Sequence, residues 1–139
     1  MRFIKTATGY VVRLDREEEV LEGLTTFVEK AGLVGGAISG IGAVKDTVLG
    51  YLDPETRTYR KERFPEDMEL VNLTGNITWV DGRPFVHAHA TISGADFVAR
   101  AGHLFEARVA VTGEFYVHPS NVRLERVADP ATGAKLISD

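Results

Sequence analysis

Residues 79–92 read WVDGRPFVHAHATI and combine a turn signal with a strand pattern. Asp81-Gly82 is typical of a two-residue hairpin turn, because a type I′ turn needs positive φ angles that these residue types tolerate. The residues after the turn alternate between two sets, which are Val86, Ala88, Ala90 and Ile92, and Phe85, His87, His89 and Thr91. Successive side chains of a strand point to opposite faces, so we expect one apolar core face and a second face that carries both histidines.

The flanking segments extend this pattern. Upstream, Val71, Leu73, Ile77 and Trp79 alternate, which predicts that residues 68–92 form one β-hairpin. Downstream, we expect a loop or a single helical turn over 93–102 and a strand over 104–118. The predicted core face of that strand consists of Phe105, Ala107, Val109, Val111, Phe115 and Val117. His118, beside Pro119, is interpreted as a surface residue.

A helix is predicted over residues 16–31. Asp15 and Glu18 have the spacing of a capping box, and Glu17, Glu18 and Glu19 set negative charge against the positive end of the helix dipole. Gly32 is a natural stop after the helix. One helical face is apolar and carries Val20, Leu24, Phe27 and Ala31.

The remaining segments predict short strands and turns. The glycine-rich stretch 35–44 follows a helix and enters β-like sequence, so we interpret it as a closely packed strand or bulge and not as a phosphate-binding loop. The other expected elements are an edge strand or hairpin over 2–14, a hairpin of 46–52 and 58–64 around the turn 53–56, a short strand over 121–127, a turn at 130–133 and a last strand at 134–137.

The composition indicates a single α+β domain over residues 1–139, because 44% hydrophobic residues suffice for one core. No apolar run approaches the roughly 20 residues of a membrane-spanning helix, so we expect a cytoplasmic protein with no membrane partner. The lack of cysteine excludes disulfides, thiol nucleophiles and cysteine-based zinc sites. A formal net charge of −4 is unusual for a stand-alone nucleic-acid binder, because such proteins neutralise phosphates with lysine and arginine.

Histidines are the strongest candidates for metal ligands. On a strand, His87 and His89 would have Cα atoms roughly 6–7 Å apart on one face, so both imidazoles could bind one zinc ion. His103 offers a third imidazole and would complete an open site whose fourth position takes water or a small ligand. Glu69 or Asp96 would supply a fourth ligand or a partner of a ligand. The alternative is that the histidines are structural, because His-x-His alone is a weak pattern.

The order and spacing of four segments resemble a known family. The segments are 39–44 (SGIGAV), 69–76 (ELVNLTGN), 82–89 (GRPFVHAH) and 102–104 (GHL). The family is the PPC domain, the plant-and-prokaryote-conserved domain, which accompanies AT-hook motifs in plants and usually stands alone in prokaryotes. The resemblance covers nearly the whole chain and points to the standalone prokaryotic form.

The resemblance implies a mixed or mostly antiparallel β-sheet flanked by one main helix and assembled as a homotrimer. It also implies that His87, His89 and His103 match positions at which some prokaryotic members hold zinc, near subunit contacts. Ala101 replaces the first glycine of a common Gly-Gly-His-Leu, so the segment that aims His103 is expected to differ.

Three functional hypotheses follow. The leading one is a homotrimeric binding or assembly module, with a histidine-lined site for zinc or a small ligand and no catalytic role. Prokaryotic members often carry a provisional DNA-binding label, so the second is a regulatory DNA-binding protein that uses Arg57, Arg60, Lys61 and Arg63. Residues 81–84 (DGRP) are not an AT-hook, because an aspartate replaces its first arginine. The third is a zinc-dependent hydrolase or lyase, with Glu69 or Asp96 as general base.

Overall fold

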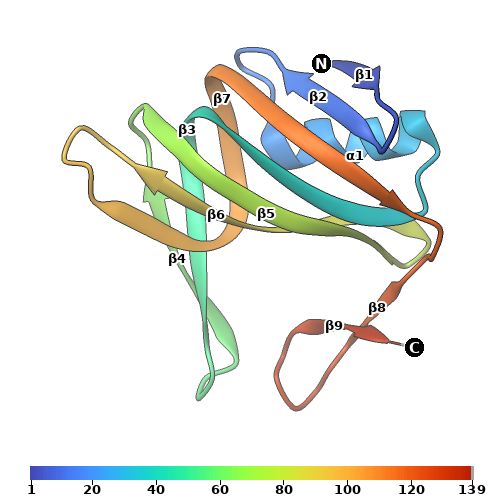
Figure 1. The fold of residues 1–139 in the computed structure, drawn as a ribbon. Coiled ribbons are helices and arrows are strands. Elements are labelled where there is room, and N and C mark those ends of the chain that lie inside the picture. Colours follow the sequence, from blue (N-terminus) through green and yellow to red (C-terminus); the bar gives the residue numbers. More distant parts are fainter. Residues whose placement is uncertain (139) are drawn as a thin grey trace.

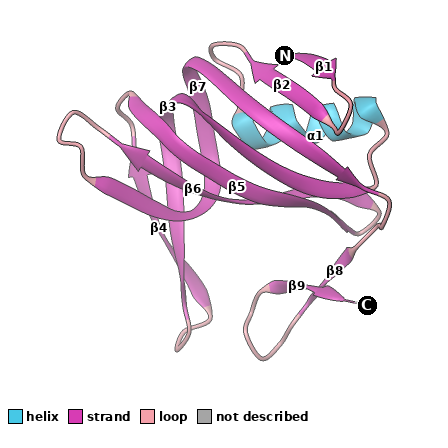
Figure 2. Cartoon of the chain, in the orientation of Figure 1, coloured by secondary structure: helices cyan, strands magenta, loops and turns pink. Residues whose placement is uncertain are grey.

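The computed structural model describes residues 1–138, which form one helix and nine strands (Figure 1, Figure 2). The helix is α1 (Val20–Ala31). The strands are β1 (Arg2–Lys5), β2 (Tyr10–Leu14), β3 (Gly35–Asp53), β4 (Thr58–Phe64), β5 (Met68–Val80), β6 (Arg83–Ser93), β7 (Ala99–Ser120), β8 (Glu125–Ala128) and β9 (Lys135–Ser138). Neighbouring strands are antiparallel except β5 and β8, so the predicted mixed, mostly antiparallel sheet is confirmed.

The two longest strands, β3 and β7, pair with each other from Gly35↔Ser120 to Gly50↔His103. The first half of β3 also pairs with β5, and its second half pairs with β4. Strand β6 pairs with β5 on one side and with the start of β7 on the other. The pairings β3–β5, β5–β6, β6–β7 and β7–β3 therefore form a closed circuit, which Figure 1 shows as strongly curved strands.

The glycine-rich stretch lies in β3, as predicted, and its pairing with β5 shifts register between Gly40 and Gly42. A Cβ atom on Gly42 would collide with the backbone carbonyl oxygen of Thr112, and one on Gly40 would collide with the ring of Phe115. Glycine at these positions lets β3 lie directly against β7.

The core lies between α1 and the sheet. Helix residues Leu24 and Phe27 belong to one buried cluster with the apolar side chains of β2, β6 and β7. The predicted alternation in β6 is confirmed, because Val86, Ala88, Ala90 and Ile92 are all buried in this cluster. The other face of β6, which carries the histidines, points away from it.

Two predicted core positions are wrong. Val111 is 69% exposed, and Phe105 lies on the histidine face. The pairing of β5 with β6 also shifts register between Leu70 and Asn72, where Leu70 is buried and Val71 is 51% exposed. The pairing of β3 with β7 shifts at three places along its length. A strict period of two cannot follow such bulges.

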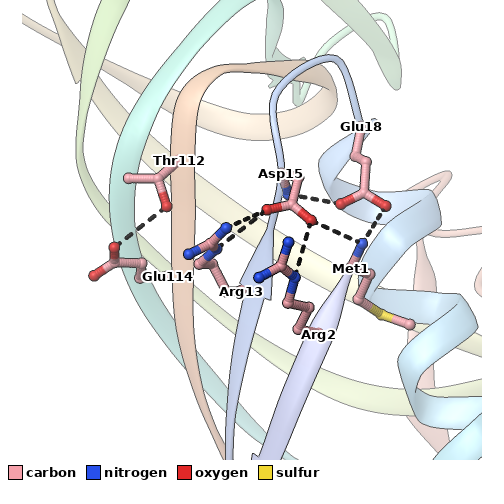
Figure 3. Close-up of polar contacts among 7 residues, drawn as sticks. All are labelled: Met1, Arg2, Arg13, Asp15, Glu18, Thr112 and Glu114. Atoms are coloured by element: carbon pink, nitrogen blue, oxygen red, sulfur yellow. Dashed lines mark hydrogen bonds and ion pairs between the residues drawn. The ribbon is translucent and has the colours of Figure 1, made fainter.

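The predicted start of the helix is also wrong, because α1 begins at Val20. Glu17 has a positive φ of 72°, and the carboxylate of Glu19 caps the helix by accepting a hydrogen bond from the Glu22 amide at 2.6 Å. Glu18 does accept from the Asp15 amide at 2.6 Å, and it also binds the Met1 ammonium group at 2.6 Å (Figure 3). These contacts fasten the β1–β2 hairpin to the start of the helix.

The other predicted element boundaries differ less from those of the structure. Gly32 ends α1 with a φ of 64°, and the turn at Asp81-Gly82 has the expected positive φ angles. The predicted hairpins at the N-terminus and around 53–56 are confirmed. The loop predicted over 93–102 is shorter, because β7 already begins at Ala99, and the C-terminal strands are β8 and β9. The helix in residues 1–138 is not long and apolar enough to cross a membrane.

The tight contact at Gly42 predicts a loss of stability on adding one methyl group. We expect Gly42→Ala to lower the free energy of unfolding by about 1–3 kcal/mol, because the backbone oxygen of Thr112 has no room to retreat between paired strands. Gly94→Ala is the matched control, because its nearest contact would be the flexible end of Met68 at 3.3 Å. Urea unfolding measures both, and equal midpoints for the two variants would contradict this account.

Candidate metal centre

Three histidines converge on the face of the sheet that points away from the core. His87 and His89 lie on β6 and His103 lies on β7, and the register pairs His89 directly with His103. One ligand nitrogen from each lies within 4.8 Å of the others. Among residues 1–138 this group consists of these three side chains alone.

The spacing of the imidazoles fits a small metal ion. The Nε2 atom of His87 and the Nδ1 atom of His103 are 3.2 Å apart. Zinc bonds to imidazole nitrogen of 2.0–2.1 Å in a tetrahedron separate two ligand nitrogens by about 3.4 Å. Imidazole ligands also suit copper, nickel and iron, so the donor set defines a class of metals. Three nitrogens leave a fourth position open.

Aromatic side chains from neighbouring strands wall one side of the cluster. The rings of Tyr59 and Phe105 lie 5.1 Å and 4.6 Å from the ring of His103, centroid to centroid. The ammonium group of Lys61 lies 3.7 Å from the centre of the Phe105 ring. Gly50 lies beneath them, and a Cβ atom there would collide with Phe105. Glycine at position 50 therefore makes the aromatic wall possible.

Arg126 of β8 contacts the cluster at His87. Its Nη2 atom donates to the side-chain oxygen of Asn76 at 3.0 Å and lies 2.9 Å from Nδ1 of His87. Its Nε atom donates to the hydroxyl oxygen of Thr78 at 2.9 Å, and Thr78 is buried. The guanidinium group is thus held in one orientation against the cluster.

Two of the imidazoles are neutral at pH 7. Burial lowers the pKa of His87 to about 4, with further contributions from the charges of Arg126 and His89. Burial also lowers the pKa of His103 to about 4, assisted by the charges of His87, His89 and Lys61. A metal ion binds only unprotonated nitrogen, so these surroundings favour the form of the ring that can ligate.

The structure does not bring Glu69 and Asp96 into this cluster. Glu69 lies on β5 opposite Ser93, and Asp96 forms an ion pair with Arg100 at 2.7 Å. The hydrogen bond from Arg100 holds the pKa of Asp96 down at about 2. Ala101, the departure from the family pattern, is exposed in β7 and leaves His103 in register with β6.

The four basic residues predicted to contact nucleic acid make different contacts. Arg57 donates to the carbonyl oxygen of Pro130 at 2.9 Å, and Arg63 pairs with Glu106 at 2.6 Å. Lys61 lies over Phe105, and Arg60 shares a shallow hollow with Glu62 and Arg100.

Sequence reasoning missed four residues of the site. Tyr59 could have been found, because it is two residues from Lys61 and therefore shares its face of β4. Phe105 was assigned to the core, and the register shifts of β7 place it elsewhere. Asn76 and Arg126 carried no signal, since β8 lies far along the chain from β5 and meets it in one parallel bridge, Trp79↔Glu125.

Solved structures of similar proteins share this fold. A "putative DNA binding protein" from Bacteroides thetaiotaomicron matches with a TM-score of 0.93 at 33% identity, over 99% of this chain and 96% of its own. A metal-containing protein from Archaeoglobus fulgidus matches with a TM-score of 0.88 at 34% identity, over 100% and 99%. A plant- and prokaryote-conserved (PPC) protein from Pyrococcus horikoshii matches with a TM-score of 0.87 at 31% identity, over 99% and 95%.

No curated protein sequence matches the chain. The sequence model of the Plants and Prokaryotes Conserved (PCC) domain matches residues 1–121, which include the three histidines, Tyr59 and Phe105 but not Arg126. The chain therefore belongs to the Plants and Prokaryotes Conserved (PCC) domain family.

Proposed function

We propose that this chain is a zinc-binding module that assembles as a homotrimer. The observation that carries the proposal is the convergence of three imidazole nitrogens within 4.8 Å on two paired strands. Support comes from the Archaeoglobus fulgidus relative, which is described as metal-containing. Zinc is the metal we favour, because it accepts three histidines and leaves a fourth position for water or a small ligand.

Strand pairing and burial position the histidine rings before any metal arrives. Strand pairing fixes the backbones of His89 and His103, so little conformational freedom is lost on binding. Burial keeps His87 and His103 neutral. The Tyr59 and Phe105 rings shield one side of the cluster from water. A bound zinc ion would act there as a Lewis acid towards whatever occupies its fourth position.

Binding is better supported than hydrolysis. A zinc hydrolase or lyase needs a general base within reach of the metal-bound water. The carboxylates suggested for that role, Glu69 and Asp96, lie outside the histidine cluster, and Asp96 forms an ion pair with Arg100. The charged groups that act on the imidazoles are Arg126 and Lys61, which are cations and poor proton acceptors.

An exposed apolar patch supports self-association. Ile41, Val71 and Val111 are 58%, 51% and 69% exposed and line one shallow hollow between β3, β5 and β7. Contiguous apolar surface of this kind marks an interaction site more often than scattered residues do. We infer that copies of this chain cover the patch in the trimer.

A regulatory DNA-binding role is the second candidate. The name of the Bacteroides thetaiotaomicron relative favours it, and β4 carries Arg60 and Lys61 on an exposed edge. Assembly around a symmetry axis would gather these residues from several chains. The ion pair of Arg63 with Glu106 lowers the charge that β4 can offer to phosphates.

The zinc proposal predicts about one zinc ion per chain in protein purified without chelator. His89→Ala and His103→Ala should each weaken zinc binding by more than about 100-fold, because changing even a partner of a ligand costs about 10–100-fold. His118→Ala is the matched control, since His118 is an exposed histidine at the far end of β7. Elemental analysis and chelator competition measure both quantities. Full zinc content in His89→Ala, or none in the parent protein, would refute the proposal.

The self-association proposal predicts that Val111→Asp dissociates the trimer, because a carboxylate cannot be buried in an apolar contact without a partner. Light scattering coupled to gel filtration should give three times the chain mass for the parent and a single chain mass for the variant. Val127→Asp changes a comparably exposed valine on β8 and should remain trimeric. Dissociation of both variants, or of neither, would place the interface elsewhere.

The DNA-binding candidate predicts an affinity for duplex DNA that falls steeply between 50 mM and 200 mM salt, because phosphate contacts release counterions. Arg60→Ala should reduce the slope of log affinity against log salt by about 0.9 for each phosphate that its guanidinium group neutralises. Arg83→Ala, at the start of β6, is the control. Absent binding, or binding that salt does not change, would count against this candidate.

A further inference from the structure

We propose that Arg126 and a metal ion compete for His87, so that the C-terminal β8–β9 hairpin controls loading of the three-histidine cluster. The inference rests on the proposed zinc site. Arg126 lies outside residues 1–121, the part of the chain that matches the family. The proposed control therefore lies in the C-terminal segment that follows the part matched by the family model.

The hydrogen bonds of Arg126 fix the tautomer of His87. A guanidinium group carries donors and no acceptor, so the contact of 2.9 Å between Nη2 and Nδ1 requires the nitrogen of His87 to accept. In a neutral imidazole the proton then resides on Nε2. That Nε2–H group faces Nδ1 of His103 at 3.2 Å and donates to it. Arg126, His87 and His103 thus form one directed chain of hydrogen bonds.

This chain leaves His87 and His103 unable to ligate together. The lone pair on Nδ1 of His87 accepts from Arg126, and its Nε2 carries a proton. The lone pair on Nδ1 of His103 accepts from His87. A metal held by Nε2 of His87 would move the proton to Nδ1, where it would point at the Arg126 donor only 2.9 Å away. A metal held by Nδ1 would take the lone pair that Arg126 uses. In either case Arg126 must withdraw.

The hairpin that carries Arg126 is lightly attached. Its backbone meets β5 in the bridge Trp79↔Glu125 and in a hydrogen bond from the Trp79 amide to the carbonyl oxygen of Leu124 at 2.9 Å. Side chains add the hydrogen bonds of Arg126 and the one from Arg57 to the carbonyl oxygen of Pro130 at 2.9 Å. Arg123 lies over the Trp79 ring at 3.9 Å. Figure 1 shows β8 and β9 projecting from the curved sheet. Elements with few buried apolar contacts open at low free energy, so withdrawal of β8 is feasible.

Because the sheet is fixed and the hairpin can move, we expect the hairpin to be the part that metal binding displaces. His87, His89 and His103 sit on paired strands, so metal loading displaces Arg126 and not the histidines. Coupling of this kind is reciprocal, so anything that draws the hairpin away raises metal affinity, and metal binding frees the hairpin. Anything that fixes the hairpin against β5 lowers metal affinity.

The first test compares zinc affinity in Arg126→Met and in the parent protein, by competition with a coloured chelator. We expect about 10-fold tighter binding in Arg126→Met, because a hydrogen bond to a charged group no longer has to be broken. Arg83→Met removes the same charge from the start of β6 and should bind zinc like the parent. Equal affinities for Arg126→Met and the parent would overturn the inference, as would equal tightening in Arg83→Met.

The second test uses the parent protein alone and does not depend on a variant folding. Nitrogen-15 NMR of the His87 ring should show an unprotonated Nδ1 in metal-free protein and a changed tautomer on zinc addition, with faster amide exchange in β8. A protonated Nδ1 before zinc is added would overturn the inference. If neither the parent nor Arg126→Met binds zinc, the proposed function fails and the competition fails with it. If both bind zinc equally, only the competition fails.

Discussion

The antiparallel ladder between β3 and β7 is the constraint on which the rest of the structure depends. It runs from Gly35↔Ser120 to Gly50↔His103 and so crosses nearly the full length of both strands. At one end it supports β2 and the helix that covers the core. At the other end it sets His103 beside His89 and leaves Gly50 beneath the aromatic wall. The histidine cluster is therefore a consequence of how two long strands pair, and not of a loop.

Glycine is what makes that ladder compatible with the curvature of the sheet. A side chain at Gly40 or Gly42 would collide with β7, and one at Gly50 would collide with Phe105. The same small residues permit the register shifts that bend β3 as it passes from β5 to β4. Curvature in turn lets β6 reach both β5 and the start of β7. Without it His87, His89 and His103 would lie on a flat sheet with no pairing between β6 and β7.

The sequence predicted those parts of the structure that depend on local pattern. Alternation in 85–92 identified the histidine face, and Asp81-Gly82 identified the turn, because strand period and turn chemistry are properties of neighbouring residues. Val111 and Phe105 were misplaced because bulges reset the period, and bulges arise from pairing with distant strands. Arg126 could not be predicted, since its contacts with Asn76 and His87 depend on where a C-terminal hairpin docks.

The charged side chains that approach the histidines are cations. A catalytic zinc site needs a general base within reach of the metal-bound water. Here Arg126 and Lys61 approach the imidazoles, and both lower the pKa of a histidine. Cations beside a metal weaken its binding by repulsion, yet they favour an anionic group in the open fourth position. If the cluster holds a metal, as proposed above, Arg126 opposes that metal, and the three-histidine group found in residues 1–138 includes no carboxylate that could receive a proton.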